Sequence, residues 1–148
     1  MSGDDEQEEM NFFLEIERIE DYRFKVDFDK ESMGEIITDE TEEVGGHEEG
    51  PNPGRLLAAS TLNCLMASLT FCLKKKRVDL GDLEGKIEGT IQRVDGRLRI
   101  TQLNAEIRPE VDDDDKEKLE KCIEMFEDYC IVTQSIRNGI EVNVDVEV

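Results

Sequence analysis

Hydrophobic and polar residues alternate one by one in two segments near the N-terminus. Residues 12–17 follow this pattern, and residues 22–29 repeat it, with one apolar face made of Tyr22, Phe24, Val26 and Phe28. A period of two predicts a β-strand with one apolar face in each segment. Gly34 precedes a third, shorter strand expected at residues 35–38, and residues 39–51 are expected to form an acidic, glycine-containing loop.

A long uncharged stretch follows and predicts a helix. Asn52 is the expected N-cap and Pro53 the first helical residue, and the basic end of the helix falls near Arg77. Residues 56–73 carry no charge for 18 positions and therefore imitate a membrane span. Five of these 18 residues are polar, and the flanking strands need a packing partner. We therefore expect the core helix of a globular domain rather than a membrane helix.

The second half of the chain predicts a hairpin. Residues 83–91 alternate in the manner of a strand, and Asp95-Gly96 is a strong signal for a tight turn. The return strand is expected at residues 97–108. Its apolar phase shifts between Ile100 and Leu103, which predicts a β-bulge there.

An aspartate run at residues 112–115 precedes the next predicted helix. The run lacks the alternating ligands of a calcium loop, and Asp114 with Glu117 is instead expected to form a capping box. One helical face collects Leu119, Cys122, Ile123, Phe126, Tyr129 and Cys130.

The C-terminal residues predict a short helical turn and then a strand. Thr133 is expected to cap the turn, which ends at Gly139, and alternating residues 140–148 predict a last strand. The predicted order β-β-β-α-β-β-α-β indicates the α+β class.

Composition narrows the class of protein. We expect a disordered acidic tail at residues 1–10 and a single domain at residues 11–148. With 18 Lys and Arg against 38 Asp and Glu, the net charge of -20 disfavours nucleic acid and anionic membranes as partners. Residues 1–10 do not resemble a secretory signal, which predicts a cytoplasmic protein with reduced cysteines. Because no C-x-x-C occurs, no metal site is expected, and His47 is expected to be a surface residue.

Two sequence motifs that contain or precede a cysteine point to a family. Cys64 follows the stretch Gly-Pro-Asn-Pro-Gly-Arg-Leu-Leu-Ala-Ala-Ser at residues 50–60, and Cys130 begins Cys-Ile-Val-Thr-Gln-Ser-Ile. The pair of motifs resembles those of the OsmC/Ohr family, whose members are thiol-dependent hydroperoxide reductases. The resemblance covers roughly residues 24–148.

The resemblance implies both a fold and a chemistry. The fold would be OsmC-like, with antiparallel sheets wrapped around long central helices in an intertwined homodimer. The activity would be that of a cysteine-based peroxidase that reduces organic hydroperoxides. Cys64 would be the peroxidatic nucleophile and Cys130 the resolving thiol. No bound cofactor is expected, and an external dithiol would supply the electrons. Cys72 and Cys122 are expected to be core packing residues.

The nucleophile needs help to ionise. Cys64 lies twelve residues beyond Asn52, about 18 Å along a helix axis, too far for the helix dipole. The family supplies an arginine held by a glutamate that follows the Asn-Pro pair, but this chain has Gly54 there. Glu48 or Glu49 could replace that glutamate, and the candidate cations are Arg55, Arg23 and Arg18.

Two other functions remain open at this stage. One is a thiol-based redox sensor or regulatory dimer with little turnover, which the missing glutamate favours. The other is a non-catalytic, small-molecule-binding relative in which both cysteines are inert.

Overall fold

The computed structural model describes residues 8–148, which form two compact units divided after Arg55. Helices and antiparallel strands occur together, which confirms the predicted α+β class. The tail predicted at residues 1–10 lies largely outside the described residues. The single domain predicted for residues 11–148 stays a prediction.

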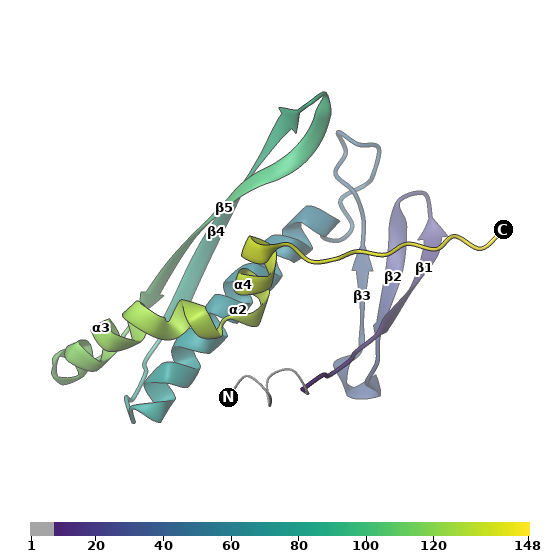
Figure 1. Ribbon diagram of the computed structural model, residues 1–148. Helices are drawn as coiled ribbons and strands as arrows, with labels where there is room; N and C mark the ends of the chain where they lie inside the picture. The colour runs from purple at the N-terminus through teal and green to yellow at the C-terminus, as the bar shows by residue number, and fades with distance from the viewer. Residues whose placement is uncertain (1–7) are drawn as a thin grey trace. The chain divides into compact units, whose positions relative to one another are not determined.

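The first unit contains a three-stranded antiparallel sheet in the order β1-β2-β3. Its strands are β1 (Leu14–Glu20), β2 (Arg23–Phe28) and β3 (Glu35–Thr38), close to the predicted segments (Figure 1). A short 3₁₀ turn, Glu31–Met33, joins the last two strands, and Gly34 ends it with a φ of 70°. A positive φ favours glycine, so Gly34 suits the position directly before β3.

The second unit contains a long two-stranded hairpin of β4 (Leu83–Val94) and β5 (Arg97–Pro109). Asp95 and Gly96 both have positive φ, 51° and 82°, as a tight hairpin turn requires. Thr90 pairs with Gln102 and Ile91 with Ile100, which leaves Thr101 as the extra residue of a bulge. The predicted turn and bulge are therefore confirmed.

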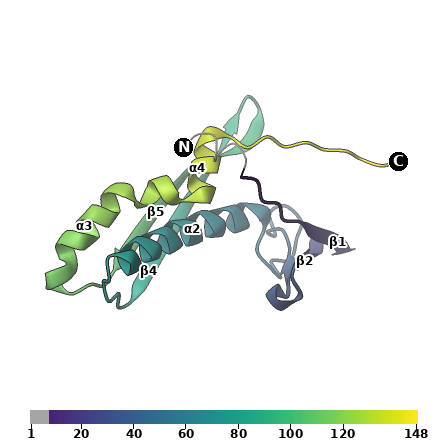
Figure 2. The same cartoon turned by 60° about the horizontal axis from the view of Figure 1, so that its bottom comes forward.

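Helices cover the hairpin. The long helix α2 (Pro53–Lys75) lies against it, since a side chain added at Gly85 of β4 would meet Met66 and Leu62 of α2. A second helical layer runs alongside α2 (Figures 1 and 2). It consists of α3 (Lys116–Met125), a 3₁₀ turn (Phe126–Tyr129) and α4 (Ile131–Asn138). The buried core of this unit comprises Leu65, Leu69, Leu73, Val78, Cys122, Phe126 and Cys130.

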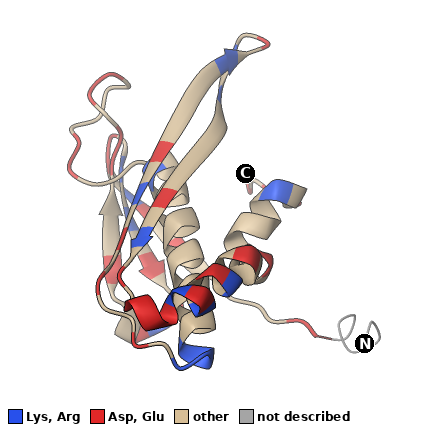
Figure 3. Cartoon of the chain, turned by 90° about the vertical axis from the view of Figure 1, so that its left-hand side faces the viewer, with Lys and Arg blue, Asp and Glu red and all other residues tan. Residues whose placement is uncertain are grey.

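Helix α2 is long and apolar enough to cross a membrane, with a mean hydropathy of 1.7 over its most apolar window. Its buried residues, Thr61, Leu65, Leu69 and Leu73, recur every four positions, and the three leucines belong to the core of the second unit. Such a stripe is that of a core helix, as predicted. Its last turn carries Lys74 and Lys75, and the 3₁₀ turn Asp113–Asp115 is acidic. Figure 3 shows how basic and acidic residues are distributed over the chain.

Three local predictions are wrong. Asp114 caps no helix, because residues 113–115 form a 3₁₀ turn and α3 begins after Asp115 without a side-chain cap. Thr133 lies inside α4, whose N-cap position belongs to Cys130. Residues 140–148 are extended but pair with no strand among the described residues, because a strand exists only where its backbone finds a partner.

Candidate functional site

Helix α2 carries Cys64. The Asn52 side chain accepts a hydrogen bond from the Arg55 backbone N–H at 3.0 Å, which confirms the predicted N-cap. Cys64 then lies in the middle of the helix, half-buried, and packs against the core of the second unit. Its thiol is free.

Cys130 lies between the 3₁₀ turn and α4. Its backbone is extended, with φ -81° and ψ 102°, so it occupies the N-cap position of α4. Its carbonyl oxygen accepts a hydrogen bond from the Gln134 N–H at 3.0 Å, the first bond of that helix. The side chain is fully buried and the thiol is free.

The two free thiols lie near each other, although 66 residues separate them along the chain: Cys64 packs against the buried cluster that contains Cys130. Burial raises the pKa of Cys64, and the neighbouring Cys130 raises it further. The fold therefore brings the two predicted site residues close together. Their roles as nucleophile and resolving thiol stay predictions.

The surroundings of Cys130 lower its pKa, whereas those of Cys64 raise the pKa of that thiol. Burial raises the pKa of Cys130, but hydrogen bonds from Thr133, Cys64 and Ser68 outweigh that effect and lower the pKa overall. The Thr133 hydroxyl lies 3.0 Å from the sulfur and can donate to it once the thiol proton has left. Within this unit the negative charge therefore rests more easily on Cys130 than on Cys64.

Cys72 and Cys122 are not separate packing residues. They form a disulfide between α2 and α3, with the Cα atoms 5.8 Å apart. The expectation that all four cysteines are reduced is therefore wrong for this pair. One signal in the sequence could have indicated it, because Cys64 and Cys72 have the same eight-residue spacing as Cys122 and Cys130.

An apolar groove of about 580 Å³ lies in the second unit, and Thr133, the neighbour of Cys130, is one of its lining residues. Its walls come from α2, from both strands of the hairpin and from the helices after them. Thr133 lines the groove and also contacts Cys130, so it connects the two features.

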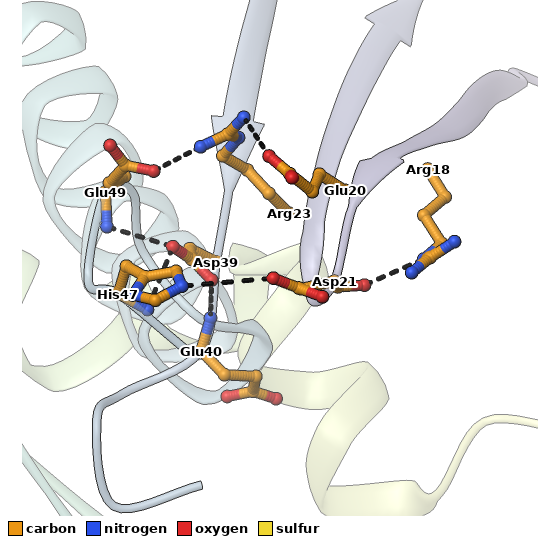
Figure 4. Close-up of polar contacts among 8 residues, drawn as sticks. All are labelled: Arg18, Glu20, Asp21, Arg23, Asp39, Glu40, His47 and Glu49. Atoms are coloured by element: carbon orange, nitrogen blue, oxygen red, sulfur yellow. Dashed lines mark hydrogen bonds and ion pairs between the residues drawn. The ribbon is translucent and has the colours of Figure 1, made fainter. Parts of the chain in front are cut away.

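The first unit pairs two of the predicted charged residues. The Arg23 guanidinium donates to the Glu49 carboxylate and lies 3.5 Å from Glu20 (Figure 4). The hydrogen bond with Glu49, followed by the attraction of its charge, raises the pKa of Arg23. Glu49 therefore holds an arginine within the first unit, and its role as a substitute for the missing family glutamate stays a prediction.

The other charged candidates lie elsewhere. Arg18 donates to the backbone oxygen of Asp21 at 2.8 Å, and Glu48 accepts the backbone N–H of Glu42 at 3.1 Å. Arg55 is exposed, and none of the ion pairs found in residues 8–148 includes it. The structure thus brings Arg23 and Glu49 together and leaves these three apart.

Asp39 organises the loop that carries Glu49, a role that the sequence did not reveal. Its carboxylate is almost fully buried and accepts backbone N–H groups of Glu40, His47 and Glu49 at 2.7, 3.2 and 3.2 Å (Figure 4). Burial raises the pKa of Asp39, but these three hydrogen bonds outweigh it and lower the pKa. The His47 ring faces Asp21 at 3.9 Å.

Two glycines allow this loop to close. A Cβ at Gly46 would lie 2.1 Å from the carbonyl oxygen of Glu40, and a Cβ at Gly50 would lie 2.2 Å from that of Ile37. Both obstacles are backbone atoms, which cannot move aside as a flexible side chain can. The loop therefore requires glycine at both positions.

The family model for OsmC-like proteins matches residues 46–145, which is more than half of the chain. The chain belongs to the OsmC-like protein family. This match confirms the family resemblance that the two cysteine motifs indicated. No curated protein matches the sequence significantly.

Solved structures show that the OsmC-like chain has the fold of its family. An OsmC-like protein of unknown function from Vibrio cholerae is 14% identical with a TM-score of 0.70, over 86% of this chain and 94% of that one. A hypothetical protein from Aquifex aeolicus is 22% identical with a TM-score of 0.69, over 88% and 90%. An organic hydroperoxide resistance protein OsmC from Legionella pneumophila is 14% identical with a TM-score of 0.64, over 86% and 90%.

Proposed function

We propose that this OsmC-like protein reduces organic hydroperoxides to alcohols through Cys64 and Cys130. The observation that carries the proposal is that two free thiols from distant parts of the sequence lie near each other in the core of the second unit. The relative of the same fold from Legionella pneumophila, whose name includes organic hydroperoxide resistance, supports it. The protein would act in the cytoplasm.

The proximity of the two thiols suggests how the nucleophile forms. Cys130 loses its proton first because its pKa is the lower of the two, and its thiolate then takes the proton of Cys64 in an uphill step that the attack on the peroxide completes. The Cys64 thiolate attacks the terminal oxygen of the hydroperoxide, and the O–O bond breaks. The departing alkoxide takes the proton from Cys130 and leaves as the alcohol, while Cys64 becomes a sulfenic acid.

The second half of the reaction joins the two sulfurs. The Cys130 thiolate attacks the Cys64 sulfur, the S–O bond breaks, and the hydroxide leaves as water after protonation. The two cysteines have then lost two electrons, which the peroxide has gained. An external dithiol restores both thiols by exchange, so the reaction needs no bound cofactor.

The groove supports an apolar substrate. Its walls carry mainly aliphatic side chains, including Leu65, Leu69 and Ile136, and Thr133 leads from it to Cys130. An alkyl or lipid hydroperoxide could place its carbon chain there and its peroxide group at the thiols. Hydrogen peroxide would gain nothing from such a groove.

Arg23 is the proposed cation for Cys64. A neighbouring positive charge would lower the pKa of Cys64, against the effect of burial. Among the three candidate arginines, Arg23 is the one that a carboxylate holds in the family manner, with Glu49 as its partner.

A homodimer is proposed as the working form. Large apolar side chains are exposed on β1 and at the far end of the hairpin, among them Leu14, Ile16, Ile91 and Leu98. Residues 140–148 also have the alternating pattern of a strand, and they pair with no strand within residues 8–148. A second copy would cover these surfaces and pair with this segment.

A redox sensor is the second candidate. Gly54 replaces the family glutamate, and burial raises the pKa of Cys64. Both features would slow peroxide reduction and leave a disulfide that forms once and persists.

Steady-state reduction of cumene hydroperoxide with dihydrolipoamide tests the proposal. The wild type should consume peroxide continuously, and Cys64→Ser should abolish consumption. Ser60→Ala is the matched control, because Ser60 is exposed and bonds only to the Leu56 carbonyl of its own helix. A single stoichiometric oxidation without turnover would contradict the enzyme and favour the sensor.

A further inference from the structure

The four cysteines form two pairs along one helical interface. Cys64 and Cys72 lie eight residues apart in α2, and Cys130 and Cys122 lie eight residues apart in the segment that packs against it. Eight residues correspond to about 12 Å along a helix. One pair is a covalent link and the other a pair of free thiols, about two helical turns apart.

We propose that Cys72 and Cys122 are a second redox pair, whose disulfide holds Cys130 beside Cys64. The proposal concerns the position of the Cys130 thiol, so it goes beyond peroxide reduction and does not depend on it. It accounts for a disulfide at the place where α3 meets the end of α2.

The segment that carries Cys130 is weakly attached without this link. Residues 112–128 contain nine acidic and three basic side chains, a net charge of -6, which repel one another. Its attachment to α2 depends on a few groups. Cys122 and Phe126 are buried, Leu119 is partly buried, and Lys118 donates to the Lys76 carbonyl at 3.2 Å.

The link acts directly on the position of Cys130. Only the end of α3 and the 3₁₀ turn lie between Cys122 and Cys130. The Cys130 N–H donates to the Glu127 carbonyl at 3.1 Å, and the side chain of Gln134 donates to the same carbonyl, also at 3.1 Å. These bonds make the segment a short, ordered connection, so a fixed Cys122 restricts where Cys130 can lie.

Burial sets the order of events when the link closes or opens. Cys122 is fully buried, whereas Cys72 is partly exposed. To close, the Cys72 thiolate attacks a small-molecule disulfide and releases one thiolate. Cys122 then loses its proton, attacks the Cys72 sulfur of the mixed disulfide and releases the second thiolate. The small molecule gains the two electrons that the cysteines lose, and a dithiol reverses the steps.

Thiol counting tests whether the pair is a disulfide in solution. Protein purified without reductant should show two alkylatable thiols after unfolding, Cys64 and Cys130, and a crosslinked peptide containing Cys72 and Cys122. If Cys72 and Cys122 are both alkylated, even after incubation with oxidised dithiothreitol, the proposal is wrong.

Bridging with dibromobimane tests the effect on Cys130, because this reagent joins two thiols only when they lie close together. Mass spectrometry of the peptides identifies the Cys64–Cys130 product. We expect this product to form about tenfold more slowly in the Cys72→Ala/Cys122→Ala variant than in the disulfide-linked wild type. Fully reduced wild type should show the same loss.

The reduced wild type keeps the test decisive if the double variant fails to fold, since it contains no substitution. Circular dichroism checks the fold of each form. Equal bridging rates in the linked and the reduced wild type would overturn the proposed role. Neither measurement uses a peroxide, so its outcome is independent of the proposed enzyme activity.

Discussion

The Thr133 hydroxyl lies 3.0 Å from the sulfur of Cys130, and both groups are buried. Thr133 belongs to the first turn of α4, whose N-cap position Cys130 occupies. The hydroxyl and the Thr133 backbone N–H both lower the pKa of this cysteine. A residue predicted from sequence to be a helix cap therefore acts on the thiol itself.

Replacing Thr133 with valine, a residue of similar size, should raise the pKa of Cys130, because the thiolate loses a hydrogen-bond donor. The ultraviolet absorbance of the thiolate, followed against pH in a Cys64→Ser background, measures this change. Thr70→Val is the matched control, since the Thr70 hydroxyl donates to the Met66 carbonyl of its own helix. An unchanged Cys130 titration in Thr133→Val would contradict the assignment.

Replacing Glu49 with glutamine should lower peroxide turnover about tenfold or more, because Arg23 loses the charge that holds it in place. Glu48→Gln is the matched control: it is the adjacent residue, and its carboxylate bonds to a backbone N–H instead of an arginine. Turnover is measured with cumene hydroperoxide at saturating dithiol. Equal rates for the two variants would remove Arg23 from the proposed site.

Replacing Asp39 with asparagine should reduce stability at neutral pH but not in strong acid. The hydrogen bonds lower the folded-state pKa of Asp39 below its ordinary value of 3.8. Its stabilising effect is therefore complete above the unfolded-state pKa and disappears as the pH falls through the folded-state value. Melting temperatures of the wild type and the variant should converge towards low pH.

Asp79→Asn is the control for this measurement, because Asp79 is exposed. Its melting curve should follow that of the wild type at every pH. A constant difference between Asp39→Asn and the wild type, from neutral to strongly acidic pH, would show that the charge of Asp39 does not carry the effect.

Gly46→Ala should destabilise the protein by ~1–3 kcal/mol, since the new methyl group would meet the Glu40 carbonyl oxygen. Chemical denaturation gives the free energy of unfolding. Gly89→Ala serves as the control: its Cβ would meet a Leu103 side-chain carbon at 3.2 Å, which can move. If both variants lost the same stability, the tight closure of the loop would not be the cause.

Local patterns predicted most of the secondary structure. The alternation in residues 22–29, the Asn52 cap and the Asp95-Gly96 turn each depend on neighbouring residues alone, and each is confirmed. The strand expected at residues 140–148 was wrong because a strand also needs a partner, which the described part of the chain does not supply.

The candidate site, like the fold, was predictable where local sequence determines it and not where distant residues come together. Family motifs indicated Cys64 and Cys130, but no spacing could show that their thiols lie near each other. Asp39 was missed because a buried aspartate that binds three backbone N–H groups looks, in sequence, like any acid of an acidic loop. The disulfide was missed because composition indicates the redox state of a compartment, not the geometry of one pair.

The most direct measurement is mass spectrometry of peptides after brief treatment with one equivalent of cumene hydroperoxide. The account predicts a new disulfide between Cys64 and Cys130, which is absent in Cys64→Ser, while the link between Cys72 and Cys122 is unchanged. Recovery of Cys64 and Cys130 as two unmodified thiols, with the peroxide unconsumed, would contradict it.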